Sequence, residues 1–498
     1  MKRLDVGPSL TWPTEALRAR SLIGGEWVSG SANTTTVTSP YNGQSLGELH
    51  HASSSDVSRA VESAASVSKE WRLVPIKERA SLLLEFRNLL ARDIDRLSVS
   101  AALESGKTFS EAKAEVLKAI EVVEFASSLE NSDLGGAIEV SRGVSCEYRR
   151  EPLGVVAGIT PFNFPAMVPM WMIPIALALG NAFILKPSDK VPLTPCILAE
   201  LIAAAGFPAG VFSILQGGRS VVEQLVVDPR VQAVGFVGSS AVAQAVYAQA
   251  TSTGKRALCL GGAKNHLIVA PDADPAITVD GIVASFTGCA GQRCMAASVL
   301  VAVGNVDHII DAVVERASQM LLGRDMGALI DAAAVSRLSK AVATAAREGA
   351  TIRLDGRNVV PPTGSEKGNW FGPSIIDNVR PSMECSCVEL FGPVLSIVRV
   401  RTIDDALKLE RESAYGNALS IFTTSGSVAR HVAGRATSGM IGINVGVPVP
   451  REPFSFGGTK DSKFGVGDIT GWGGVELWST RKKITTKWST QSDKNWMS

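Results

Sequence analysis

One cysteine stands in a setting that suits nucleophilic chemistry. Cys294 follows a glycine turn at Gly291 and lies directly after Arg293, in a small-residue segment that begins at Ser285. A thiolate next to a positive charge has a lowered pKa and acts as a nucleophile. The alternative is a buried structural thiol, which is the commoner role of a free cysteine. Other stretches of the chain favour the nucleophile, because each suits a different part of one reaction.

Two groups of polar residues further up the chain suit a dinucleotide cofactor. Lys186 and Asp189 follow a short apolar segment, and an ammonium and a carboxylate at this spacing can hold the two hydroxyls of a ribose. Gly238 and Ser239 open a predicted helix, whose free N–H groups suit a pyrophosphate. The usual Gly-x-Gly-x-x-Gly fingerprint is absent here. Taken singly, these residues fit a solvated lysine and an ordinary helix start, but together they favour a cofactor site.

An alternation of short apolar strands with helices positions these groups. We expect strands at residues 155–159, 182–185, 211–215, 233–237 and 257–260, with helices at 167–179, 194–205, 221–227 and 241–249. This pattern is typical of a parallel sheet covered on both faces, in which ligands bind beyond the carboxyl ends of the strands. The site is therefore expected just after Ile159, Leu185, Leu215, Val237 and Leu260.

Helices precede this sheet and a second αβ unit follows it. We expect a hairpin at 22–28, a strand at 34–38 and then a helical layer with no catalytic role at 57–71, 76–97 and 110–129. The second unit is expected to have strands at 265–270 and 298–303, helices at 276–287, 308–322 and 402–412, and extended segments at 389–400 and 439–449. The tail at 475–488 alternates apolar and polar residues, which predicts a strand that pairs with a neighbouring subunit.

The composition limits the class of protein. The 498 residues are too many for one hydrophobic core, and 45% apolar with 19% charged residues is typical of a globular protein. A net charge of +1 gives no electrostatic reason to expect nucleic acid or an acidic membrane surface as a partner. Seven cysteines are not a disulfide framework in so long a chain, and Cys385-Ser386-Cys387 lacks a second pair that would complete a zinc site, so a reducing cytoplasm fits best.

Two segments bear on export and membrane insertion. Residues 166–185 are apolar almost throughout, but two prolines, Gly180 and Asn181 interrupt them, so we expect a buried helix and a buried strand rather than a membrane span. Residues 1–20 lack the apolar core of a signal peptide. No metal, nucleic acid or membrane is therefore expected to take part in the function.

Six motifs occur along the chain in a fixed order. They are Pro161-Phe162-Asn163-Phe164-Pro165, Lys186-Pro187-Ser188, Phe236-Val237-Gly238-Ser239, Gly291-Gln292-Arg293-Cys294, Glu389-Leu390-Phe391-Gly392-Pro393 and Pro453-Phe454-Ser455-Phe456-Gly457-Gly458. In this order they resemble the aldehyde dehydrogenase superfamily, over residues 22–488. The chain is most similar to its CoA-acylating methylmalonate-semialdehyde and malonate-semialdehyde dehydrogenases. The features that point there are Phe162 in place of a more common tryptophan, Gly262-Ala263-Lys264-Asn265-His266, Arg293, and Asn444-Val445-Gly446-Val447-Pro448-Val449-Pro450.

The resemblance implies an α/β fold of three parts. They are a Rossmann-like NAD-binding domain at 21–130 and 152–262, an α/β catalytic domain at 263–463, and a β oligomerisation arm at 131–151 and 464–490. It also implies NAD as cofactor, CoA as co-substrate, and a homodimer or homotetramer. The carboxylate of Asp189 favours NAD over NADP, because it would repel a 2′-phosphate.

The resemblance further implies roles for single residues. Cys294 is implied as the nucleophile, and Asn163 with the Cys294 N–H as the oxyanion hole. Glu389 is implied to hold the nicotinamide ribose. The full set of implied cofactor contacts is Thr160, Phe162, Lys186, Ser188, Asp189, Gly238, Ser239, Glu389 and Phe391.

One position departs from the hydrolytic members of the superfamily. Most of them have a glutamate 34 residues before the cysteine, where this chain has Leu260. That carboxylate activates the water that cleaves the acyl-enzyme, and leucine cannot accept a proton. A thioester on Cys294 would therefore persist until a better nucleophile arrives. A thiol such as CoA needs less help from a base than water does, because a few per cent of it is already thiolate at neutral pH.

A second departure concerns the substrate. The similar enzymes have an arginine on the helix that carries Glu115, where it helps to hold the substrate carboxylate, and here the residue is Lys118. Lysine keeps the charge but loses the bidentate fork. Arg293 is a second expected anchor and Arg451 a third. We expect a short anionic aldehyde, with loss of CO₂ where the acyl group carries a β-carboxylate.

Three other functions stay open at this point. A hydrolytic aldehyde dehydrogenase with its base elsewhere would yield a free acid, and a non-catalytic protein of the same fold would bind NAD without turnover. A cysteine acyltransferase without redox chemistry would have no use for Lys186 and Glu389. His266 could act as a base, but a structural histidine at the start of a strand is the better interpretation.

Overall fold

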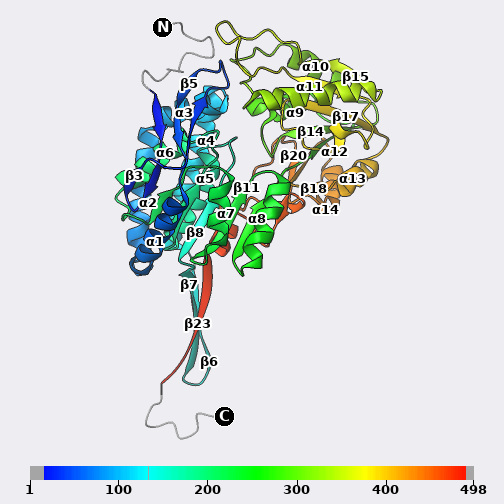
Figure 1. Ribbon diagram of the computed structural model, residues 1–498. Coiled ribbons are helices and arrows are strands. Elements are labelled where there is room, and N and C mark those ends of the chain that lie inside the picture. The colour runs from blue at the N-terminus through cyan, green and yellow to red at the C-terminus, as the bar shows by residue number, and fades with distance from the viewer. Residues whose placement is uncertain (1–15, 133, 489–498) are drawn as a thin grey trace.

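The computed structural model describes residues 16–132 and 134–488 of the chain. The predictions for residues 1–15, and the last two residues of the predicted arm, lie outside this part. Figure 1 shows two α/β lobes side by side and a narrow β ribbon that projects from the first lobe. In the described residues no helix is long and apolar enough to cross a membrane.

The first lobe is built on an eight-stranded sheet. Its order is β22 (Lys463–Phe464), β12 (Arg256–Leu260), β11 (Val231–Val237), β8 (Val155–Ile159), β9 (Ala182–Lys186), β10 (Phe212–Ile214), β2 (Ser21–Ile23) and β3 (Glu26–Val28). The five strands from β12 to β10 are parallel and match the predicted alternation, while the outer strands run antiparallel. Strand order reverses between β8 and β11, and a ligand is expected at such a point.

Helices cover this sheet. The alternating ones are α5 (Met167–Ala178), α6 (Leu193–Ala204), α7 (Arg219–Val227) and α8 (Ser240–Ser252), and the N-terminal layer is α1 (Ser54–Trp71), α2 (Ile76–Arg92), α3 (Ile94–Ser105), α4 (Phe109–Ser128) and the 3₁₀ turn η1 (Leu129–Asn131). The predicted single helix over 76–97 is wrong, because it breaks at Asp93. Asp93 leaves helical geometry with ψ of 18° and bonds Arg92, and aspartate favours such helix ends over helix interiors.

The second lobe contains a seven-stranded sheet. Its order is β15 (Thr351–Leu354), β16 (Ser374–Asp377), β17 (Val394–Val400), β14 (Ala297–Val303), β13 (Asn265–Val269), β19 (Ala418–Phe422) and β20 (Met440–Ile443). Its helices are α9 (Pro275–Thr287), η2 (Gly288–Gly291), α10 (Asp307–Ser318), α11 (Ala332–Arg347), α12 (Glu384–Cys387), α13 (Ile403–Glu412) and α14 (Gly426–Arg435). The extended segment predicted for 439–449 is a strand only over β20.

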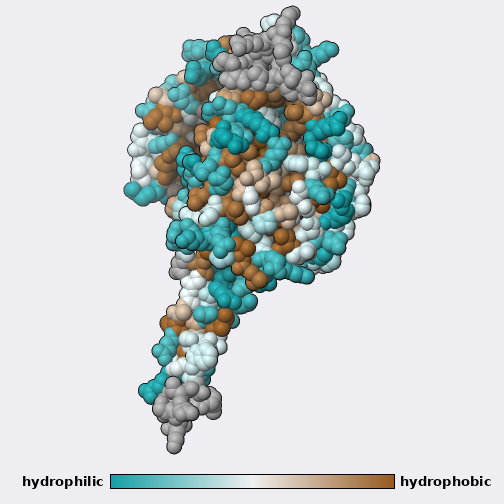
Figure 2. Space-filling model, turned by 90° about the vertical axis from the view of Figure 1, so that its left-hand side faces the viewer, coloured by the Kyte–Doolittle hydropathy of each residue, from teal (hydrophilic) through white to brown (hydrophobic). Residues whose placement is uncertain are grey.

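Small sheets complete the fold. They are β1 (Leu17–Ala19), β5 (Ser45–His50) and β4 (Thr34–Thr38) in one, and β18 (Tyr415–Gly416) with β21 (Thr459–Lys460) in another. The projecting ribbon pairs β23 (Ser479–Lys487) with β7 (Val144–Pro152) and β7 with β6 (Gly135–Ser141). The predicted tail strand is wrong at its start, because Val475 to Leu477 complete α15 (Gly471–Leu477) and pack inside the first lobe. In Figure 2 the ribbon stands clear of the body and carries apolar patches.

Candidate active site

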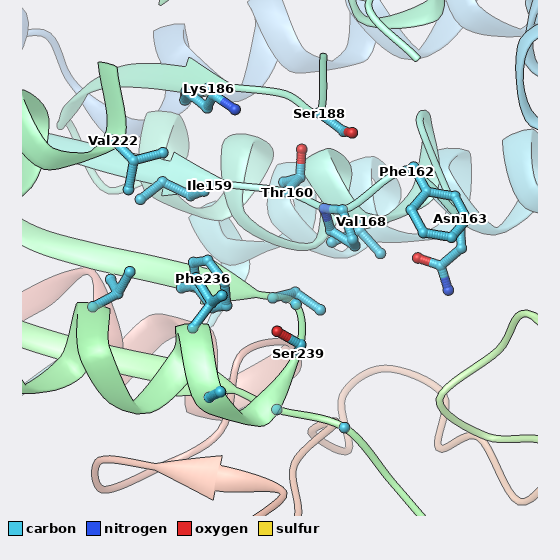
Figure 3. A pocket seen from close by; sticks show the side chains of 18 of the residues that line it. Ile159, Thr160, Phe162, Asn163, Val168, Lys186, Ser188, Val222, Phe236 and Ser239 are labelled. Carbon is cyan, nitrogen blue, oxygen red and sulfur yellow. The ribbon is translucent and has the colours of Figure 1, made fainter. Parts of the chain in front are cut away.

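A cavity of about 830 Å³ lies beyond the carboxyl ends of β8, β9, β11 and β12. All eleven residues predicted for catalysis and cofactor contact line it: Thr160, Phe162, Asn163, Lys186, Ser188, Asp189, Gly238, Ser239, Cys294, Glu389 and Phe391. In Figure 3 Lys186, Ser188 and Thr160 face Phe236 and Ser239 across the opening, and Asn163 lies toward the other end. The lobes therefore meet at one elongated site with the cysteine at its inner end.

The outer end of the cavity has the shape and charge for a dinucleotide. Lys186 ends β9 and is buried, and this burial lowers the pKa of its ammonium, against which the carboxylate of Asp189 acts in the opposite direction. α8 begins after Ser239 with its free N–H groups at the cavity wall. A Cβ built on Gly238 would lie 2.6 Å from the Phe236 ring, so this position needs glycine. These residues fit the NAD that the sequence predicts.

Cys294, the candidate nucleophile, follows a tightly held turn. Cys289 and Ala290 in η2 have positive φ values of 54° and 52°, which side chains other than glycine rarely adopt. The carbonyl oxygen of Cys294 accepts hydrogen bonds from Asn265 Nδ2 at 2.7 Å and Asn417 Nδ2 at 2.9 Å. Both amides fix the backbone of the cysteine from the second lobe.

The expected lowering of the Cys294 pKa is wrong. Burial raises the pKa of this thiol to about 12, and the nearby carboxylate of Glu389 acts in the same direction. Arg293 opposes the shift only weakly, since its guanidinium turns back to α9 and donates to the carbonyls of Ala284 at 2.5 Å and Ser285 at 2.9 Å. The free protein therefore holds a neutral thiol at neutral pH.

Asn163, the predicted oxyanion donor, has one amide hydrogen available in the cavity. Its buried side chain lines the same cavity as Cys294, and Nδ2 donates one hydrogen to Gln292 O at 2.9 Å. An amide nitrogen carries two hydrogens, so the second is left for an incoming oxygen. The bond to Gln292 also ties the loop after β8 to the turn that carries the nucleophile.

Glu389 stands between the two ends of the cavity. Burial raises the pKa of its carboxyl to about 7, and Oε1 accepts the Ala263 N–H at 2.9 Å. Its Oε2 covers Gly262, where a built Cβ would be only 2.3 Å away. Phe391 follows with a positive φ of 54° and meets the edge of the Phe162 ring at a centroid distance of 5.7 Å.

Arg337 is a site residue that the sequence did not reveal. It projects from α11 into the cavity lining and donates to Leu390 O at 3.3 and 3.2 Å. It stands in an amphipathic helix that carries none of the six motifs, and nothing in its sequence neighbourhood sets it apart from a surface arginine.

At position 260, where most hydrolytic members of the superfamily have a glutamate, this chain has a leucine and therefore no carboxylate. It ends β12 with 4% exposure and belongs to the apolar cluster against which Cys294 packs. The acidic residues that line the cavity are Asp189, Glu223 and Glu389. Glu389 is the one whose charge acts on the Cys294 thiol.

The three predicted substrate cations do not line the cavity. Lys118 Nζ is held by Glu452 Oε2 at 2.6 Å and Glu121 Oε2 at 3.0 Å, and Arg451 Nη1 reaches Glu121 Oε1 at 3.2 Å. Arg293 bonds α9 as described above. Each of these side chains already has acceptors within the protein, and their role as substrate anchors stays a prediction.

His266 is a structural residue, as its sequence position indicated. It is buried in β13, outside the cavity lining, and burial lowers its pKa to about 4, so it stays neutral. Within the described residues, no group of three or more His, Cys, Asp or Glu is placed to hold a metal ion.

Comparison with known proteins shows the family of the chain. A model described as the aldehyde dehydrogenase family matches residues 27–484. Malonate-semialdehyde dehydrogenase 2 of Geobacillus thermodenitrificans is 40% identical over 483 residues, which cover 95% of this chain and 100% of the relative. The malonate-semialdehyde dehydrogenase of Halalkalibacterium halodurans is also 40% identical, with coverage of 95% and 98%.

Comparison with solved structures points to the same family. The methylmalonate-semialdehyde dehydrogenase of Oceanimonas doudoroffii superposes with a TM-score of 0.93 at 37% identity, covering 95% of this chain and 99% of its own. A structure from Sinorhizobium meliloti 1021, described as a methylmalonate-semialdehyde dehydrogenase complexed with NAD, gives 0.94 at 37% identity, with coverage of 96% and 100%. The chain belongs to the aldehyde dehydrogenase family.

Proposed function

We propose that the protein oxidises malonate or methylmalonate semialdehyde with NAD and passes the acyl group to CoA. The observation that carries the proposal is Leu260, a buried apolar residue at the position where hydrolytic relatives have their base, in the cluster against which Cys294 packs. The names of the relatives, the NAD held by the structure from Sinorhizobium meliloti and the fit of the cavity support it.

The chain's own residues divide the reaction between them. Cys294 Sγ attacks the aldehyde carbon, and the oxyanion lies between Asn163 Nδ2 and the Cys294 N–H. Loss of one such donor typically costs about 10² to 10³ in rate. When bound, NAD accepts the hydride, which leaves a thioester on Cys294. A β-carboxylate on the acyl group then leaves as CO₂, and the α-carbon takes up a proton from solvent. The CoA sulfur bonds to the acyl carbon while the bond to Cys294 Sγ breaks, and the proton of the CoA thiol passes to the released Cys294 sulfur.

A hydrolytic reaction is the second candidate, and Glu389 favours it. This carboxylate lines the same cavity as Cys294, and with a pKa raised by burial to about 7 it can accept a proton near neutral pH. Water activated by Glu389 would release a free acid without CoA.

The experiment measures NADH formation from malonate semialdehyde with and without CoA. Steady turnover that requires CoA, with a single-turnover burst in its absence, is expected. Steady turnover without CoA would establish the hydrolytic reaction instead. NAD binding without a burst from any aldehyde would leave a non-catalytic protein of this fold.

The proposal also covers subunit assembly through the arm, the domain boundaries and the cellular compartment. The ribbon of β6, β7 and β23 exposes Ile138 and Val140 at 67% and 56%, which suits burial against another subunit of a homodimer or homotetramer. We propose the NAD-binding, catalytic and arm segments with the boundaries given from the sequence. All seven cysteines are free, which suits a reducing cytoplasm.

A further inference from the structure

One face of α4 carries charged residues at a spacing that makes them neighbours. Glu111, Glu115 and Lys118 are four and three residues apart, and positions at this spacing lie on the same side of a helix. Glu115 is buried. Each residue contacts a different segment around the active site, although α4 itself does not line the cavity.

Glu115 holds the segment that follows the oxyanion donor. Its Oε1 accepts the N–H groups of Ala166, the N-cap residue of α5, at 2.7 Å and of Met167, its first residue, at 3.1 Å. Its Oε2 accepts a hydrogen bond from Lys107, and both side chains are almost fully buried. The Lys107 ammonium also lies 3.6 Å over the ring of Phe164, a cavity wall next to Asn163. A buried ion pair is a costly way to gain stability, so its use here indicates a positional role.

Glu111 holds the turn that precedes the nucleophile. Its Oε1 accepts the Cys289 N–H at 2.6 Å, across the boundary between the lobes. Its Oε2 caps α4 by accepting from Thr108 N at 3.0 Å and Thr108 Oγ1 at 2.9 Å. Cys289 and Ala290 in this turn both have left-handed backbone conformation, and such a turn persists only where its surroundings fix it.

We propose that Glu111 and Glu115 are positioning residues that set the placement of Asn163 relative to Cys294. Both carboxylates project from one rigid helix, one to the oxyanion loop and the other to the nucleophile turn. The hydrogen bond from Asn163 to Gln292 O closes this frame at the site itself. The proposal rests on the oxyanion role proposed for Asn163 and not on the identity of the aldehyde.

The test compares Glu115→Gln and Glu111→Gln with two matched controls. Glu104 is buried and accepts the Leu193 and Thr194 N–H groups at 2.8 Å at the start of α6, as Glu115 does for α5. Asp56 forms the same capping box on α1 that Glu111 forms on α4. Glu104→Gln and Asp56→Asn therefore remove the helix-start bonds without touching the oxyanion loop or the nucleophile turn.

The readouts are the NADH burst rate per active site, the KM for NAD, thermal stability, and alkylation of Cys294 by iodoacetamide without cofactor. Any aldehyde that the wild type oxidises serves for the burst, so a wrong substrate class would not affect the comparison. For Glu115→Gln we expect a burst at least tenfold slower, with alkylation and the KM for NAD within twofold, because alkylation does not use Asn163. For Glu111→Gln we expect at least a threefold change in alkylation as well.

Both controls should lose stability while their burst rates stay within twofold of the wild type. The proposal is overturned if Glu115→Gln and Glu111→Gln behave like the controls, that is, if they lose stability while their burst rates per active site stay unchanged. Glu115→Asp keeps the charge and withdraws the carboxylate by one methylene, so it provides the same comparison if the glutamine variant does not fold.

Discussion

Replacement of Gly262 tests whether the use of NAD depends on the position of the neighbouring Glu389 carboxylate. A Cβ at this position would lie 2.3 Å from Glu389 Oε2 and 3.1 Å from its Cδ. The backbone cannot retreat, because the Gly262 N–H donates to Ser240 Oγ at 2.9 Å and its carbonyl accepts from Ser462 Oγ at 2.7 Å. In Gly262→Ala the carboxylate must therefore move by about 0.7 Å to reach even the shortest separation of 3.0 Å found for real Cβ atoms.

We expect Gly262→Ala to impair the use of NAD and not the folding of the protein. Gly262 does not have a positive φ, so alanine fits its backbone, and the displaced group is the end of a flexible side chain. A hydrogen bond from a charged group is worth about 1.5–3 kcal/mol. Loss of the bond to the nicotinamide ribose that the resemblance implies for Glu389 should therefore lower kcat/KM for NAD by about 10- to 150-fold. The melting temperature should be unchanged or slightly higher.

Steady-state kinetics with varied NAD, on four variants, tests this reasoning. Gly434 has no atom within 4 Å of a built Cβ, so Gly434→Ala is the matched control and should leave kcat/KM unchanged. Glu389→Ala removes the group that Gly262→Ala displaces, so adding Gly262→Ala to it should change the rate less than twofold. A decrease of less than threefold in kcat/KM for NAD in Gly262→Ala would refute the argument. The same decrease on adding Gly262→Ala to the wild type and to Glu389→Ala would refute it as well.

Four further predictions rest on the contacts and pKa shifts described above. Because burial raises the Cys294 pKa to about 12, alkylation of the free protein should rise about tenfold per pH unit from pH 7 to 10, and a plateau near pH 8 would contradict this. Asn163→Ala should slow the NADH burst by about 10² to 10³. Glu452→Gln removes one of the two partners of Lys118, so the KM for an anionic aldehyde should fall several-fold while that for a neutral aldehyde stays unchanged. His266, with its pKa lowered to about 4, favours unfolding as the pH falls from 6.5 to 4, so His266→Gln should remove about 3 kcal/mol of that acid sensitivity in urea unfolding and none above pH 7.

Local patterns in the sequence predicted the sheet of the first lobe and the residues at the ends of its strands, whereas Asn163, Glu389 and Phe391 were predicted from the resemblance. Short apolar strands alternate with helices there, and the residues just after Ile159, Leu185 and Val237 face one opening. The break at Asp93 was missed because apolar spacing continues across it.

What could not be predicted depends on contacts between distant segments. Lys118 reads as a free cation until Glu452, 334 residues away, is placed beside it. Glu111 and Glu115 read as solvent-facing charges of a helical layer, yet their acceptor atoms meet Cys289 and the start of α5. The pKa of Cys294 follows from burial by the whole fold, and no neighbour in the sequence reveals it.

The apolar surroundings of Cys294 have two opposite effects on one reaction. Burial keeps the thiol neutral, which makes the first attack harder in the free protein. Leu260, in the apolar cluster against which Cys294 packs, offers no carboxylate at the position where hydrolytic relatives have one, so under the proposed function the thioester would outlast the oxidation step. An acceptor thiol gains from the second effect, because it needs little base assistance. A hydrolytic enzyme would bear the first effect without that gain, so the replacement of a base by Leu260 is physically consistent with transfer to CoA.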